Sequence, residues 1–156
     1  MPSFPLDLPS ADLGRIRTAN PPHLLSAKTM PYSADQPYHA HIYFDAASRP
    51  AAEALASRFR HEVDGIRFVG SLKAANAGPH PQPQFEVHFS YGVLPAVRQL
   101  IAATAFTALI HPLTDDDLAD HTTLAEWIGK PLPLDLSTLD PPGHNQGVAR
   151  FGKADF

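Results

Sequence analysis

Three short segments of the chain alternate between apolar and polar side chains, and this alternation restricts the possible folds more than any other feature. In residues 38–44, 85–91 and 106–111, every second side chain is apolar. A period of two, with β-branched and aromatic residues, predicts strands that turn one face toward a core. A fourth strand is predicted over residues 66–73, between Gly65 and a loop rich in glycine and proline.

Helical periodicity separates the predicted strands. Residues 50–63 place apolar side chains at steps of four, and further helices are predicted over residues 94–103 and 115–128. The order β-α-β-β-α-β plus one helix is that of ferredoxin-like α+β domains. We therefore predict a four-stranded antiparallel sheet, in the spatial order 4-1-3-2, with helices on one face.

The distribution of the 17 prolines predicts how the chain is divided. Residues 1–36 are expected to form a proline-rich N-terminal arm, because proline lacks an amide proton and restricts its neighbour. Residues 37–135 are expected to form the ferredoxin-like domain, and residues 136–156 an irregular C-terminal tail.

Composition excludes several classes of partner. The net charge is −4 and the chain has no run of lysine or arginine, which argues against a nucleic-acid partner. No apolar stretch approaches the roughly 20 residues of a membrane helix. The N-terminus lacks the features of a signal peptide, and the chain has no cysteine. A cytoplasmic protein is expected.

The polar faces of the predicted strands carry histidines that the topology brings together. His39 and His41 lie on the first strand, and His111 ends the fourth strand beside them. The third strand is expected to run parallel to the first, which puts its start, Glu86, and the loop residue His80 at the same end. Five candidate metal ligands then converge, although a pair of strand histidines is by itself more often a polar surface.

Without cysteine, a transition metal would have to bind through nitrogen and oxygen atoms. Imidazole with carboxylate suits Fe(II), zinc or manganese, and two histidines with one carboxylate are typical of non-haem Fe(II) oxygenases. His88 is expected further along its strand, as a pocket-lining side chain first and a ligand second. His121 shares a predicted helical face with Leu118 and Ala125. It is interpreted as a buried histidine or as a proton-transfer residue.

Several motifs resemble those of the DOPA 4,5-dioxygenase family, the fungal-type family with bacterial members. The similar segments span residues 37–135 and are YHAHIYF (38–44), GPHP (78–81), FEV (85–87), LIHPLT (109–114), DDLADH (116–121) and WIG (127–129). The resemblance implies extradiol ring cleavage of L-DOPA or a related catechol by O₂. It also implies non-haem Fe(II) and a ferredoxin-like subunit that is commonly paired into a dimer.

The resemblance and the predicted topology together assign roles to seven residues. We predict that the metal ligands are His39, His41 and His111. The predicted catalytic residues are His80 and His121. Glu86 and His88 are predicted as additional ligands or pocket residues. Zinc is the alternative metal in the protein as purified. The alternative functions are a metal- or small-molecule-binding protein of the same fold without O₂ chemistry, and a different metalloenzyme such as a hydrolase or isomerase.

The histidine-bearing sheet face also predicts an assembly. It carries Tyr43 and Leu109, and a monomer is expected to leave it uncovered. Large apolar patches are uncommon on monomers. We therefore predict a symmetric homodimer, paired sheet face to sheet face in a barrel-like arrangement, with the terminal arms helping.

Overall fold

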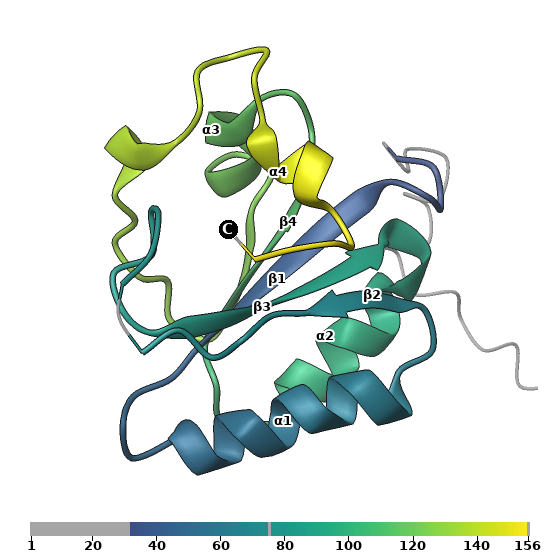
Figure 1. Cartoon of the computed structure of the whole chain (residues 1–156), viewed down its shortest axis with the longest axis vertical. Coiled ribbons are helices and arrows are strands. Elements are labelled where there is room, and N and C mark those ends of the chain that lie inside the picture. The colour runs from purple at the N-terminus through teal and green to yellow at the C-terminus, as the bar shows by residue number, and fades with distance from the viewer. Residues whose placement is uncertain (1–31, 75, 156) are drawn as a thin grey trace, which may run out of the picture. The chain divides into compact units, whose positions relative to one another are not determined.

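A computed structural model describes residues 32–74 and 76–155, so nearly all of the predicted N-terminal arm lies outside the described residues. The chain forms a single five-stranded sheet in the order β2-β3-β1-β4-β5, with antiparallel neighbours throughout (Figure 1). Its strands are β1 (Pro37–Tyr43), β2 (Ile66–Val69), β3 (Gln84–Ser90), β4 (Ala108–Pro112) and β5 (Glu126–Ile128).

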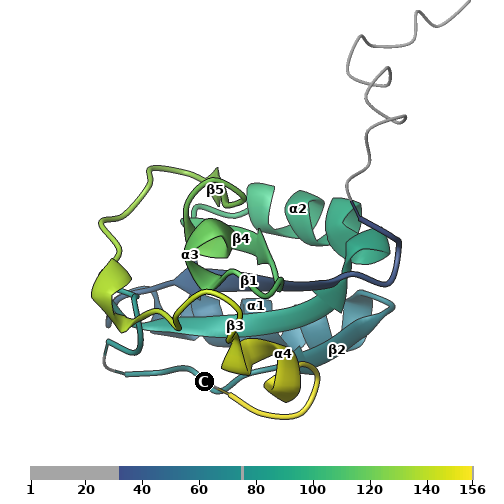
Figure 2. The same ribbon diagram turned by 90° about the horizontal axis from the view of Figure 1, so that it is seen from above.

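Two helices cover one face of this sheet, α1 (Arg49–Glu62) and α2 (Leu94–Ala102) (Figures 1 and 2). Hydrogen bonds between Asp45 and Ser48 form the turn before α1, whose first turn contains Pro50. The apolar strand faces pack against the helices in one core, which includes Ile42, Phe59, Phe85, Val87, Phe89, Ile101 and Ile110. The α+β class, the first six elements and the order of the first four strands are therefore as predicted.

The direction of β3 corrects one expectation. We predicted that the first and third strands run parallel, but β1 and β3 are antiparallel, with His39 opposite His88 and His41 opposite Glu86. Helix α1 returns the chain so that β2 runs in the direction of β1, and the connection to β3 then reverses it. His88 is therefore a direct neighbour of His39 rather than a residue further along the sheet.

The predicted helix over residues 115–128 is also wrong in its extent. Helix α3 covers only Asp117–His121, beginning where the Asp116 carboxylate accepts a hydrogen bond from the Ala119 amide. The backbone leaves the helical conformation at Thr122, and β5 follows as a fifth strand against β4. An edge strand offers unpaired backbone groups, and β5 satisfies those of β4.

The predicted C-terminal tail, residues 136–156, is not irregular throughout. It contains the 3₁₀-helix η3 (Leu136–Thr138) and the helix α4 (Gln146–Arg150), which lie with α3 on the sheet face opposite α1 and α2 (Figure 1). The amide of Asn145 donates to the Thr114 carbonyl over 2.8 Å and to the Asp120 carboxylate over 3.1 Å. From residue 32 onward the chain forms one compact unit.

The elements α3, η3 and α4, with the chain that connects them, form a second layer over the sheet face opposite α1 and α2. This second layer removes the observation on which the predicted homodimer was based. Tyr43 is 2% exposed and Leu109 is 0% exposed, so the sheet face is covered within a single chain. The homodimer stays a prediction that a measured mass in solution can test. No helix among the described residues has the length and apolar character needed to cross a membrane.

Replacing Asp120 tests how the second layer is held. The buried carboxylate accepts hydrogen bonds from the Thr114 amide over 2.9 Å, from the Thr114 hydroxyl over 2.6 Å and from Asn145. Asp120→Ala leaves these donors unsatisfied, so urea denaturation should show a free energy of unfolding lower by about 2–3 kcal/mol. Asp115→Ala, an exposed neighbour, should stay within about 0.5 kcal/mol. Equal stability of the two variants would contradict this role.

Candidate metal centre

Three adjacent strands place five metal-binding side chains on the sheet face opposite α1 and α2. In the central strand, His39 lies between His88 of β3 and His111 of β4, and His41 lies opposite Glu86. All five side chains are buried. Their convergence follows from the alternation of each strand, because one face of each is filled by apolar side chains in the core.

Two further histidines reach these side chains from segments outside the sheet. His80 comes from the loop before β3 and His121 from the end of α3, and both are buried. The His80 ring lies 4.1 Å from that of His41, and the His121 ring lies 4.2 Å from that of His111, measured between centroids. The structure therefore brings all seven predicted site residues into one cluster.

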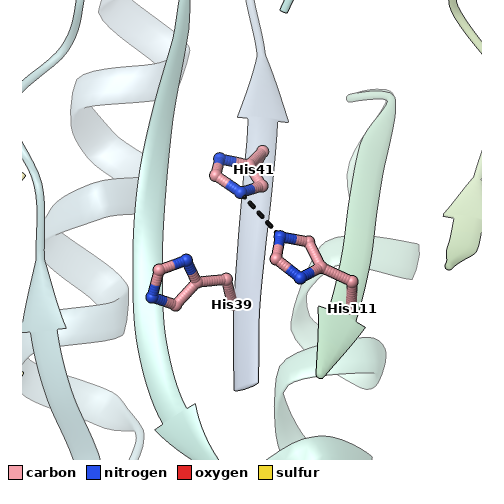
Figure 3. Close-up of side chains that lie close together, drawn as sticks. All are labelled: His39, His41 and His111. Atoms are coloured by element: carbon pink, nitrogen blue, oxygen red, sulfur yellow. Dashed lines mark hydrogen bonds between the residues drawn. The ribbon is translucent and has the colours of Figure 1, made fainter. Parts of the chain in front are cut away.

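Hydrogen bonds fix which nitrogen of two histidines can bind a cation. His111 Nδ1 donates to the Pro112 carbonyl over 2.7 Å, and His41 Nδ1 lies 3.2 Å from Gln84 Oε1. With both Nδ1 atoms protonated, each neutral ring presents a lone pair at Nε2. The two Nε2 atoms lie 3.0 Å apart (Figure 3).

That separation fits a shared metal ion. Two lone pairs that face each other at 3.0 Å repel unless a cation lies beside both. Two metal–nitrogen bonds of about 2.0–2.1 Å that meet at a right angle hold their nitrogens about 3 Å apart. The donor atoms of His41 and His111 are therefore arranged as neighbouring ligands of one ion.

Within residues 32–74 and 76–155, three overlapping groups have ligand atoms within 4.8 Å of one another, namely His39–His41–His111, His41–His80–His121 and His39–Glu86–His88. The third group is chemically the least suitable. The Gly152 amide donates to His88 Nδ1 over 2.9 Å, so neutral His88 carries its proton on Nε2, 3.3 Å from Glu86 Oε1. The lone pair of His88 thus accepts a hydrogen bond from the C-terminal segment, residues 136–155, and is not available to a metal ion. The two groups that include His41 are therefore the better candidates for a metal site.

His121 has the same hydrogen-bond arrangement as the candidate ligands. Its Nδ1 donates to the Asp117 carbonyl over 2.8 Å and lies 3.2 Å from an Asp117 carboxylate oxygen, which leaves Nε2 as the lone-pair atom. Burial would raise the pKa of Asp117, but hydrogen bonds from His121 and the Asp140 amide lower it below its usual value. The i, i+4 spacing of Asp117 and His121 is the sequence signal for this pair.

Burial keeps four of the clustered histidines uncharged, namely His39, His41, His80 and His111. It is the main cause that lowers the pKa of His39, His41 and His111 well below the ordinary value, and neighbouring histidines lower it further. Burial, with His121 nearby, lowers the pKa of His80 to about 3. Neutral imidazole is the form that binds a metal ion, so the site is prepared for a metal at neutral pH.

A cavity of about 260 Å³ opens beside the cluster, which suits a small molecule rather than a macromolecule. Its wall includes six of the seven clustered residues, and His88 is the exception. The rest of the wall comes mainly from the loop around Gly78, from α3 and from the C-terminal segment, with Asp117, Leu139, Asp140, Gln146 and Arg150. The residues of the C-terminal segment were missed by the sequence analysis, because nothing local shows that the segment returns to the sheet.

The fold and the site define a class of protein, an α+β domain with a buried multi-histidine centre beside a small-molecule cavity. Residues 38–138 match the sequence model of the Dopa 4,5-dioxygenase family, which covers more than half of the chain. The chain therefore belongs to the Dopa 4,5-dioxygenase family.

Individual relatives agree with this membership. A DOPA 4,5-dioxygenase of Amanita muscaria is 32% identical over 111 residues, which cover 65% of this chain and 49% of that protein. An uncharacterized 21.2 kDa protein of Botryotinia fuckeliana is 32% identical over 117 residues, with 65% and 62% covered. The chain thus spans about half of the first relative and 62% of the second.

A solved structure shares the fold. The crystal structure of a "putative dioxygenase" from Nostoc punctiforme aligns with a TM-score of 0.58 and 29% sequence identity. The alignment covers 67% of this chain and 91% of that chain.

The buried histidines predict that the metal-free protein loses stability in mild acid. Below about pH 6.5 the unfolded chain protonates its histidines while the folded cluster stays neutral. The unfolded state then binds more protons than the folded state. The free energy of unfolding therefore decreases as the pH is lowered, by up to about 1.4 kcal/mol per pH unit for each such histidine. Burial raises the pKa of Asp120 to about 6, so this carboxyl group stabilises the folded state as the pH is lowered. The four buried histidines, whose pKa values are lowered, outweigh this single group.

Thermal unfolding of metal-free protein between about pH 7 and pH 5 measures this effect. We expect the melting temperature of the parent to fall steeply and that of His80→Asn to fall less steeply. His61→Asn, on the exposed face of α1, is the matched control and should follow the parent. A melting temperature that stays constant over this range would contradict a neutral buried cluster.

Proposed function

We propose that this chain is a metal-dependent extradiol dioxygenase, which opens the ring of L-DOPA or a related catechol with O₂. The observation that carries the proposal is the pair of Nε2 atoms of His41 and His111. They lie 3.0 Å apart, and both line the cavity. Membership of the Dopa 4,5-dioxygenase family and the name of the Amanita relative support the reaction class.

We assign His39, His41 and His111 as the residues that hold the metal, and Fe(II) as the metal, with zinc as the alternative in purified protein. Imidazole ligands suit both ions. Bound Fe(II) would supply the redox chemistry that activates O₂ and the Lewis acidity that favours the ionised catechol. The Gln84 side chain and the Pro112 carbonyl orient two of the three rings from behind.

We assign His121 as the base that takes a catechol proton onto Nε2. Its Nδ1 proton faces Asp117, and a carboxylate behind a histidine both orients the ring and stabilises its protonated form. Burial lowers the pKa of His80 to about 3, so this ring is a poor acceptor of the catechol proton. The Tyr43 hydroxyl lies 2.7 Å from His80 Nδ1 and holds this ring beside the cavity, where it contacts the substrate.

The second layer has a chemical role in this proposal. The sheet side chains at the site are at most 2% exposed, so α3 and the C-terminal segment exclude bulk water from them. Exclusion of water strengthens electrostatic interactions inside the site and limits side reactions of activated oxygen.

The function is tested with protein loaded with Fe(II) under anaerobic conditions, then mixed with O₂ and a panel of catechols that includes L-DOPA. We expect a ring-opened yellow product, and a chelator should stop its formation. His111→Ala should lower the iron content by at least about tenfold, because the ion loses a ligand. His61→Ala should retain iron and activity. Folded, iron-loaded protein that consumes no catechol would leave the alternative of a binding protein without O₂ chemistry.

The role of His121 is tested separately from metal binding. His121→Asn should lower kcat by about 10²- to 10⁴-fold while the iron content per chain stays that of the parent. His144→Asn, an exposed histidine of the C-terminal segment that does not line the cavity, is the control. Loss of iron from His121→Asn would instead identify His121 as a ligand, and the group His41–His80–His121 as the metal site.

A further inference from the structure

The cavity wall contains one permanently cationic side chain. Among the described residues that line the cavity, Arg150 is the only lysine or arginine. It ends α4, and its Nη2 donates to Gln146 Oε1 over 3.0 Å, one helical turn earlier. This bond holds the guanidinium along the wall formed by the C-terminal segment.

The wall contains three carboxylates, and two of them, Asp117 and Asp140, accept hydrogen bonds within the second layer. Asp117 accepts hydrogen bonds from the Asp140 amide over 2.9 Å and from His121. Asp140 accepts bonds from the Gln146 amide over 2.9 Å and from the Gln146 side chain over 3.3 Å. These two acids therefore stabilise the second layer of the structure. The guanidinium of Arg150 carries only donors, in a planar arrangement that matches a carboxylate.

We infer that Arg150 binds an anionic substituent of the substrate, most simply a carboxylate, and thereby determines which catechols the site accepts. The inference rests on the proposed function for the catechol part of the ligand. It adds a specificity-determining residue from a segment that the family match, which ends at residue 138, does not reach.

The C-terminal segment is fixed to the sheet directly after Arg150. The Phe151 ring stacks on that of His88, with centroids 5.8 Å apart and planes 11° apart, and on that of His39 at 6.4 Å and 18°. The next amide, of Gly152, donates to His88 Nδ1 over 2.9 Å. His88 is thus a positioning residue, because it holds the backbone that carries Arg150.

A second anchor lies a few residues further on. The Asp155 carboxylate accepts a hydrogen bond from the Ser71 hydroxyl over 2.9 Å and lies 3.5 Å from Lys73 Nζ. A Cβ atom at Gly70 would clash with Asp155 Oδ1, so the carboxylate occupies this position because residue 70 has no side chain. Both anchors act on the segment, and neither His88 nor Asp155 lines the cavity.

Equilibrium binding of a matched pair of probes tests the inference. The probes are 3,4-dihydroxyphenylacetate and its uncharged methyl ester, titrated calorimetrically into the full chain under anaerobic conditions, with and without Fe(II). The parent should bind the carboxylate more tightly than the ester in both forms. Equal affinity for the two probes, or no binding of either probe, would overturn the inference.

Variants of Arg150 identify the source of the preference. Arg150→Gln should raise the Kd of the carboxylate about fivefold to tenfold, as for a lost charge-assisted hydrogen bond, and leave that of the ester within about twofold. Arg150→Lys should recover part of the loss. Lys153→Gln, a nearby exposed cation outside the cavity, is the matched control and should bind both probes as the parent does. A preference that survives in Arg150→Gln would show that another group supplies it.

Asp155→Ala tests the positioning of Arg150. It removes an anchor without touching the cavity, so it should raise the Kd of the carboxylate by less than Arg150→Gln does and spare the ester. An unchanged Kd for the carboxylate would overturn the positioning role of the anchor. The two proposals fail separately: a retained carboxylate preference without O₂ consumption would refute only the dioxygenase, whereas turnover of both probes with equal affinity would refute only the role of Arg150.

Discussion

The structure depends on burying a layer of imidazoles between the sheet and a second layer built from the same chain. The face of β1, β3 and β4 that points away from α1 and α2 carries several histidines beside Tyr43 and Leu109, yet it is as buried as the core. Burial of a polar group is costly unless it has partners. The chain meets this cost with hydrogen bonds behind the rings, and burial in turn keeps the rings neutral and available as ligands.

The hydrogen bonds behind the rings separate side chains that the sequence alone cannot distinguish. His88 and His111 flank His39 on opposite sides and are equally buried. The Nδ1 of His111 meets a carbonyl oxygen, whereas that of His88 meets a backbone amide. One ring therefore presents a lone pair at Nε2 and the other presents a proton. This difference supports the proposal that His111 is a metal ligand, and it connects His88 to the C-terminal segment, although both project from the same sheet face.

Much of the fold and of the site could be predicted, because both follow from alternation within strands. The predicted strands converge on His39, His41 and His111 whatever the direction of β3, since these residues lie on β1 and β4. The direction of β3 could also have been deduced from the connections between the strands. Our prediction of a parallel third strand placed His88 too far from His39. The end of α3 at Thr122 and the return of the C-terminal segment could not be read locally. They depend on bonds between distant residues, such as that of Asn145 to Asp120.

Gly70 carries a consequence that reaches beyond this chain. Its backbone amide is committed to the Glu86 carbonyl over 2.8 Å, so the strand cannot shift to admit a larger residue while Asp155 stays in place. The residue at this position therefore acts as a marker that can be read in any related sequence. A relative with a side chain there cannot place a carboxylate where Asp155 lies, so other contacts must hold its C-terminal segment to the sheet.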